Sequence, residues 1–107
     1  ITLNAATIAA DYSDTAANLV AAFAGITTHT GTLTATGATT VTQANALDTV
    51  SAGVVTATID GTATSLATLS GTTGDYTITL TAGGAAATLA ELVSINAATT
   101  GAITLNA

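Results

Sequence analysis

The sequence predicts an α/β repeat fold, a one-sided parallel solenoid in which short strands alternate with short helices. Runs in which apolar residues alternate with Thr recur along the chain, which is typical of strands with one packed and one solvated face. Between these runs, apolar residues are spaced at three or four, as on helices. Strands joined by short helices must run parallel. An all-β solenoid, in which the weak helical segments are further strands, is the alternative.

The alternating runs predict five strands, at residues 1–5, 30–36, 54–59, 76–82 and 102–107. Apolar residues such as Leu33, Val55 and Ile78 are expected to face the core, because side chains along a strand point to opposite faces in turn.

The helical spacing predicts four helices, at residues 14–24, 40–51, 62–70 and 87–97. Ser13 or Asp14 is expected to cap the first helix and Thr39 or Thr40 the second, since their side chains can accept from free backbone N–H groups. Glycines at the expected helix ends are Gly25, Gly53, Gly71 and Gly101.

Two internal periods are visible. The pentapeptide Ile-Thr-Leu-Asn-Ala begins at Ile1 and again at Ile103, an offset of 102 residues. A weaker similarity relates the residues before Gly53 to those before Gly101, an offset of 48 residues. We therefore expect residues 1–107 to be one repeat period of about 102 residues plus the first strand of the next. The period would contain two diverged half-units, near 1–53 and 54–101.

Composition limits the possible partners. The chain has no Lys or Arg, six acidic residues and a formal net charge of −6. Nucleic-acid binding is excluded, because it depends on cationic side chains that neutralise phosphates. No apolar run is long enough for a transmembrane helix, so membrane insertion is not expected. With 49% hydrophobic residues but mostly small ones, the core should be light and gain from stacking on neighbouring copies.

The chain offers no catalytic constellation. His29 is the only histidine, cysteine is absent and no serine has a G-x-S-x-G context, so the sequence shows no motif for a nucleophile–base pair. A single His near a strand start is expected on the surface. We therefore predict no catalytic residues, no enzymatic activity and no organic cofactor.

A calcium site is a possibility that rests on scattered acids. The segment Gly71-Thr72-Thr73-Gly74-Asp75 is similar to a glycine-rich calcium-binding nonapeptide, but the glycine expected beside Gly71 is absent. Calcium needs about six or more oxygen ligands. The candidate metal ligands are single acids in separate loops, namely Asp11, Asp14, Asp60 and Asp75.

Threonine is the most regular surface feature. If the apolar residues of the strands face inward, a flat threonine face points outward, made of Thr32, Thr34, Thr36, Thr56, Thr58, Thr77, Thr79 and Thr81. Threonine is also the ordinary filler of a solvated strand face. A binding module that uses this face for ice, glycan or mineral is therefore the alternative function.

Residues 88–104 resemble the Ala/Thr/Gly-rich tandem repeats of giant secreted bacterial surface adhesins, of the haemolysin-like, type I secreted kind. The resemblance implies export, a cell-surface or extracellular location, many tandem copies and, often, Ca²⁺-dependent folding. The main functional prediction is a structural segment of a long extracellular fibre, stalk or adhesin that associates with itself end to end.

Overall fold

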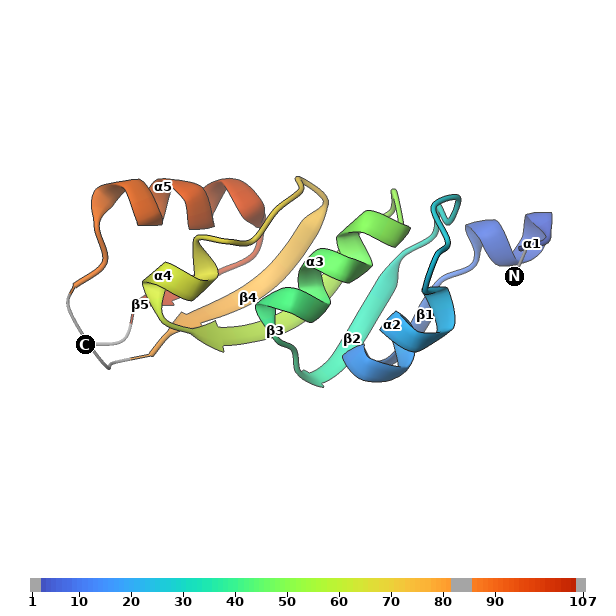
Figure 1. The fold of residues 1–107 in the computed structure, drawn as a ribbon, viewed down its shortest axis with the longest axis horizontal. Helices are drawn as coiled ribbons and strands as arrows, with labels where there is room; N and C mark the ends of the chain where they lie inside the picture. Colours follow the sequence, from blue (N-terminus) through green and yellow to red (C-terminus); the bar gives the residue numbers. More distant parts are fainter. Residues whose placement is uncertain (1–2, 82–85, 106–107) are drawn as a thin grey trace.

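The computed structural model describes residues 3–81 and 86–105 and has an α/β fold (Figure 1). Five parallel strands form one sheet in the order β1-β2-β3-β4-β5. The elements in chain order are α1 (Ala5–Ala9), β1 (Tyr12–Thr15), α2 (Ala16–Phe23), β2 (Leu33–Ala38), α3 (Val41–Val50), β3 (Val55–Gly61), α4 (Ala63–Leu66), β4 (Gly74–Leu80), α5 (Leu89–Ala98) and β5 (Ile103–Leu105). The predicted α/β class is confirmed, and the all-β alternative is wrong.

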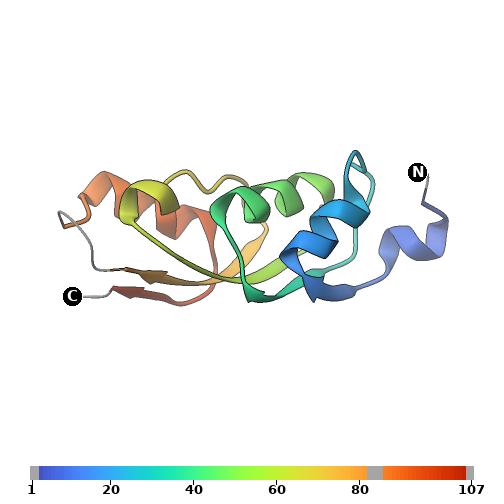
Figure 2. The ribbon, with the colours of Figure 1, turned by 60° about the horizontal axis from the view of Figure 1, so that its bottom comes forward.

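The molecule is elongated and has two layers. It measures 47 × 21 × 20 Å, with α1 and β5 toward opposite ends of the long axis (Figure 1). The helices lie on one face of the sheet, and none of those described covers the other face (Figure 2). Strands that are consecutive in the chain are also adjacent in the sheet.

Alternation in the central strands determines which side chains form the core. Leu33, Val55 and Ile78 are fully buried, as predicted. The inner faces of α2, α3, α4 and α5 pack against these strand residues and contribute Leu19, Leu47, Leu66 and Ile95 among others. Because helices cover only this face, the residues between the buried ones remain in contact with solvent.

The N-terminal strand prediction was wrong. Asn4 caps α1 through a hydrogen bond from Thr7 N–H to its Oδ1 (2.8 Å), and Ala5 is helical. Ile1 and Thr2 lie outside the described residues, as do Ala82, Asn106 and Ala107 of the other expected strands. The first strand is instead β1, whose Tyr-Ser-Asp-Thr sequence lacks apolar alternation. Its pairing with β2, in the register Tyr12 to Leu33, makes it a strand.

Threonine or asparagine caps every described helix. The caps are Asn4, Thr15, Thr40, Thr62 and Thr88. The cap at Thr40 was predicted, whereas α2 is capped by Thr15 and not by Ser13 or Asp14. Thr40 with Gln43 and Thr88 with Glu91 form reciprocal capping boxes, which satisfy two backbone donors at each helix start.

A repeated turn leads from helix to strand. The Ser51 hydroxyl is buried, lies within 2.8 Å of Gly31 O and accepts from Gly53 N–H at 3.2 Å. The Thr99 hydroxyl donates to Tyr76 O (2.8 Å) and accepts from Gly101 N–H (3.0 Å). In both turns one buried hydroxyl hydrogen-bonds to a backbone N–H of its own turn and to a backbone carbonyl of the adjacent earlier segment, Gly31 or Tyr76.

His29 occupies the position in the preceding turn that corresponds to Ser51 in the next. It is buried, so the prediction that it lies on the surface was wrong. It is 0% exposed and packs against Phe23, with ring centroids 4.8 Å apart. Its Nε2 donates to Ala10 O (2.8 Å), and its Nδ1 lies 2.8 Å from the Ser51 hydroxyl. The imidazole thus connects the N-terminal turn to the next one.

Candidate functional site

The outer face of the sheet carries the predicted threonines. Thr36, Thr58, Thr77 and Thr81 are exposed, and Thr32, Thr34, Thr56 and Thr79 are half-buried. Thr34 lies beside Thr56, Thr58 beside Thr77, and Thr79 beside Thr104. No described helix covers this face (Figure 2).

The threonines are less regularly arranged on the sheet than their alternation in the sequence predicts. The register between β2 and β3 shifts after Thr34, so that Ala38 and not Thr36 lies beside Thr58. Asp75 lies beside Thr56, and Asp60 lies beside Thr79, so both acids occupy positions within the threonine rows. The sequence places Asp60 and Asp75 in loops, but the structure places them on β3 and β4.

Asp11 and Asp14 have local structural partners. Asp11 Oδ1 accepts from Thr32 N–H (2.9 Å), and the hydrogen bonds from Thr32 lower the pKa of this carboxyl. Asp14 Oδ1 accepts from Thr15 N–H (2.6 Å) and Asn18 Nδ2 (3.1 Å), which lowers its pKa likewise. Both carboxylates therefore accept hydrogen bonds from backbone or side-chain N–H groups in or beside β1.

The structure does not gather the four candidate metal ligands. Within the described residues, no group of three or more His, Cys, Asp or Glu side chains could hold an ion. Asp60 and Asp75 are separated by four residues along paired strands, which is about 13 Å. That distance is too long for both carboxylates to bind one ion directly.

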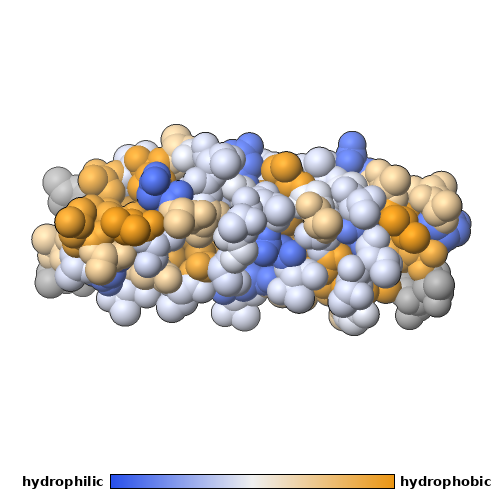
Figure 3. All heavy atoms as spheres, turned by 90° about the horizontal axis from the view of Figure 1, so that it is seen from above, coloured by the Kyte–Doolittle hydropathy of each residue, from blue (hydrophilic) through white to orange (hydrophobic). Residues whose placement is uncertain are grey.

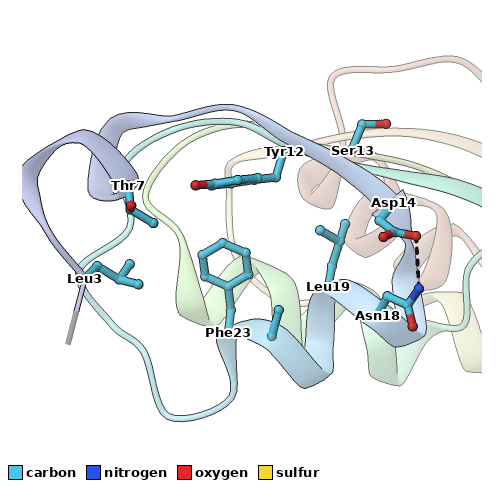
Figure 4. A pocket seen from close by; sticks show the side chains of 9 residues that line it. Leu3, Thr7, Tyr12, Ser13, Asp14, Asn18, Leu19 and Phe23 are labelled. Atoms are coloured by element: carbon cyan, nitrogen blue, oxygen red, sulfur yellow. Dashed lines mark hydrogen bonds between the residues drawn. The ribbon is translucent and has the colours of Figure 1, made fainter. Parts of the chain in front are cut away.

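The β1 end of the molecule contains a cavity of about 300 Å³. Tyr12 and Phe23 face it from β1 and α2, with Leu3 at one side and Asp14 and Asn18 at the other (Figure 4). The two aromatic rings are 5.6 Å apart, and Tyr12 is 36% exposed. The core is therefore open at this end of the sheet.

The β5 end exposes apolar side chains. Leu89 is 78% exposed, and Val93 and Leu105 are each 62% exposed. Seen from above the view of Figure 1, hydrophobic areas lie toward both ends of the long axis (Figure 3). In the described residues, β1 pairs only with β2 and β5 only with β4, so each has one free edge.

The only histidine is not placed to act on a bound molecule. Both ring nitrogens of His29 have partners inside the core, Ala10 O and the Ser51 hydroxyl. The cavity at the β1 end is lined by Tyr12, Ser13 and Asp14 of β1 rather than by His29. The His29–Ser51 pair is buried and is not among the residues that line this cavity.

No described helix has the length and hydropathy needed to cross a bilayer. Comparison with protein-family models, with curated proteins and with solved structures finds no match.

Proposed function

We propose that this chain is a structural repeat segment, one part of an α/β solenoid in a long extracellular fibre, stalk or cell-surface adhesin. The observation that carries the proposal is that both ends of the sheet are open. Each end combines a strand edge without a described partner with an apolar surface, at β1 and at β5. Exposed strand edges are sites for adding further strands, and stacked units bury such surfaces.

The spacing of equivalent features supports a repeat. The capping boxes at Thr40 and Thr88 are 48 positions apart, as are the turn hydroxyls of Ser51 and Thr99. This is the offset that relates the two half-units near 1–53 and 54–101 in the sequence. Equivalent caps and turns at one offset favour a solenoid over an unrelated succession of elements.

Composition supports an extracellular role without catalysis. A chain with no Lys, Arg or Cys has few groups for chemistry or for binding anions. The resemblance of residues 88–104 to secreted adhesin repeats favours the cell surface as the location. Self-association is the interaction that the open ends favour.

A covalent tandem of three periods, compared with a single one, tests the proposal. Packed neighbouring periods should raise the melting temperature and the urea m-value of the tandem, because interfaces between periods add buried surface. Electron microscopy of the tandem and of native material should show thin, unbranched rods. Three periods that unfold at the single-period temperature would contradict the proposal.

The uncovered threonine face supports a second function, the binding of ice, glycan or mineral. The register shift after Thr34 and the acids Asp60 and Asp75 interrupt the face, so we expect no thermal hysteresis from the tandem. The comparison is a Thr58→Lys, Thr79→Lys double variant, whose substitutions point to solvent. Ice-growth inhibition by the parent and not by the variant would favour the second function.

A further inference from the structure

Leu3 and Leu105 occupy the same position in two copies of one pentapeptide but have different surroundings. Leu3 is half-buried, packs against the core and lines the cavity with Tyr12 and Phe23. Leu105 is 62% exposed at the end of β5. The described residues include a cover for the first leucine and none for the second.

The two ends of the molecule have complementary geometry. Leu105 lies beside Leu80 and Ile103 beside Ile78, so both point to the helix side of the sheet. Tyr12 lies beside the buried Leu33 and points to the same side. An added copy would therefore bring Tyr12 and Phe23 to the face on which Leu105 is exposed.

The backbone edges are complementary as well. Tyr12 N–H donates to Thr32 O of the chain segment leading into β2. Because successive residues of a strand direct their backbone groups to opposite sides, Ser13 N–H and C=O point away from β2. Among the described residues no strand pairs with them, so this edge of β1 can accept a parallel strand.

We propose that β5 of one copy adds to the free edge of β1 of a second copy, and that its Leu105 takes the place of Leu3 at the cavity lined by Tyr12 and Phe23. The inference rests on the proposed end-to-end association and names its contact. The occupant is a second copy of this chain, because Leu3, which lines the cavity, belongs to a pentapeptide that recurs at β5. The contact is head to tail, so each copy has one donor end, β5, and one acceptor end, β1.

Sedimentation velocity over a concentration series, at high ionic strength to screen the net charge, tests the donor end. The wild-type chain should form a ladder of oligomers. Leu105→Asp should weaken the association about 10- to 100-fold, the value of one buried leucine. Val54→Asp adds the same charge at a 45% exposed residue away from both ends and should associate like the wild type. Equal effects of the two variants would overturn the proposal.

Mixing two blocked variants tests the direction of the contact. Leu105→Asp lacks a working donor end, and Ser13→Pro lacks the N–H on the acceptor edge while the β1 to β2 hydrogen bonds remain. At a concentration where each variant alone is monomeric and the wild type associates, an equal mixture should stop at a heterodimer. If Ser13→Pro does not fold, judged by circular dichroism, Tyr12→Asp replaces it. A mixture that stays monomeric beside an associating wild type would overturn the proposal.

Leu3→Ala tests whether Leu105 replaces Leu3. Removing the resident leucine should strengthen association about tenfold, because the incoming Leu105 no longer competes for its place. Weaker association would mean that Leu3 belongs to the interface, which would overturn the replacement. A monomeric wild type with a stabilised covalent tandem would overturn this contact and leave the proposed function standing. An unstabilised tandem would count against the proposed function itself.

Discussion

Glycine in the turn before β3 is a steric requirement of the close approach between successive turns. A Cβ at Gly53 would lie 2.1 Å from Gly31 O and 2.6 Å from Gly31 C, both of which are backbone atoms. Gly31 is in the same relation to Ala10 O, also at 2.1 Å. The contact between turns therefore depends on glycine having no side chain.

Replacing Gly53 should accordingly be costly. Gly53→Ala is expected to lower the free energy of unfolding by about 3 kcal/mol, the upper range for overpacking, because the clashing partner is backbone. The control is Gly61→Ala, whose Cβ would contact Leu66 Cγ at 3.5 Å, an ordinary distance. Urea denaturation measures both. Similar stabilities would show that the turns can separate without loss.

Tyr76 makes the fold sensitive to alkaline pH. It is fully buried, and its hydroxyl has no hydrogen-bond partner among the described residues. Burial, and secondarily the nearby Asp48 carboxylate, raises the pKa of Tyr76 from 10.0 to about 12. The folded state thus retains a proton that the unfolded state loses, and stability should fall as the pH rises from about 10 to about 12.

Tyr76→Phe should abolish this alkaline loss, which amounts to about 3 kcal/mol at most. At neutral pH the variant should be as stable as the wild type or more so, because it removes a buried hydroxyl without a partner. Melting temperatures measured from pH 7 to a pH of about 12 show the effect. The matched control is Tyr12→Phe, which should leave the alkaline transition in place.

At the scale of the elements, the helices depend on their caps more than on their length. The described helices have between 4 and 10 residues, which is too short for stability in isolation. Each begins at a Thr or Asn side chain that accepts a backbone N–H, as Thr40 does from Gln43 at 3.1 Å. Packing on the sheet and the hydrogen-bonded N–H groups of the first turn together stabilise the helices.

Thr40→Ala should therefore lower the free energy of unfolding by about 1 kcal/mol, because it removes a cap and half of a capping box. Thr42→Ala is the control in the same helix. Thr42 is exposed, and alanine has the higher helix propensity, so this variant should be neutral or slightly stabilising. An equal loss in both variants would indicate that composition and not capping decides the stability of α3.

At the scale of the whole molecule, the acidic side chains repel one another and have no Lys or Arg to pair with. With no Lys or Arg against six acids, added salt has repulsion to screen and few attractions to weaken. NaCl should raise the melting temperature steadily. CaCl₂ at equal ionic strength should add little, since the structure does not gather Asp11, Asp14, Asp60 and Asp75 around one point. A large additional rise with CaCl₂, reversed by EDTA, would reveal a specific calcium site.

The sequence by itself determined the α/β class, the central strands and the outward threonines. Alternation of Leu, Val and Ile with Thr reflects a local property, since consecutive side chains on a strand face opposite ways whatever lies next to them. The cap at Thr40 is also local, because a side chain reaches a backbone N–H three residues on. These features could be read without knowing which segments meet.

Only the tertiary structure decided the features that depend on contacts between distant segments. The polar β1 is a strand because β2 supplies its hydrogen bonds, and His29 is buried because Ala10, Phe23 and Ser51 surround it. The register shift after Thr34, which breaks the threonine rows, is a property of two strands together. Leu3 and Leu105 have identical neighbours in sequence, yet one is half-buried and the other exposed. Burial and pairing are set by what packs against a residue, and that information is not contained in its local sequence.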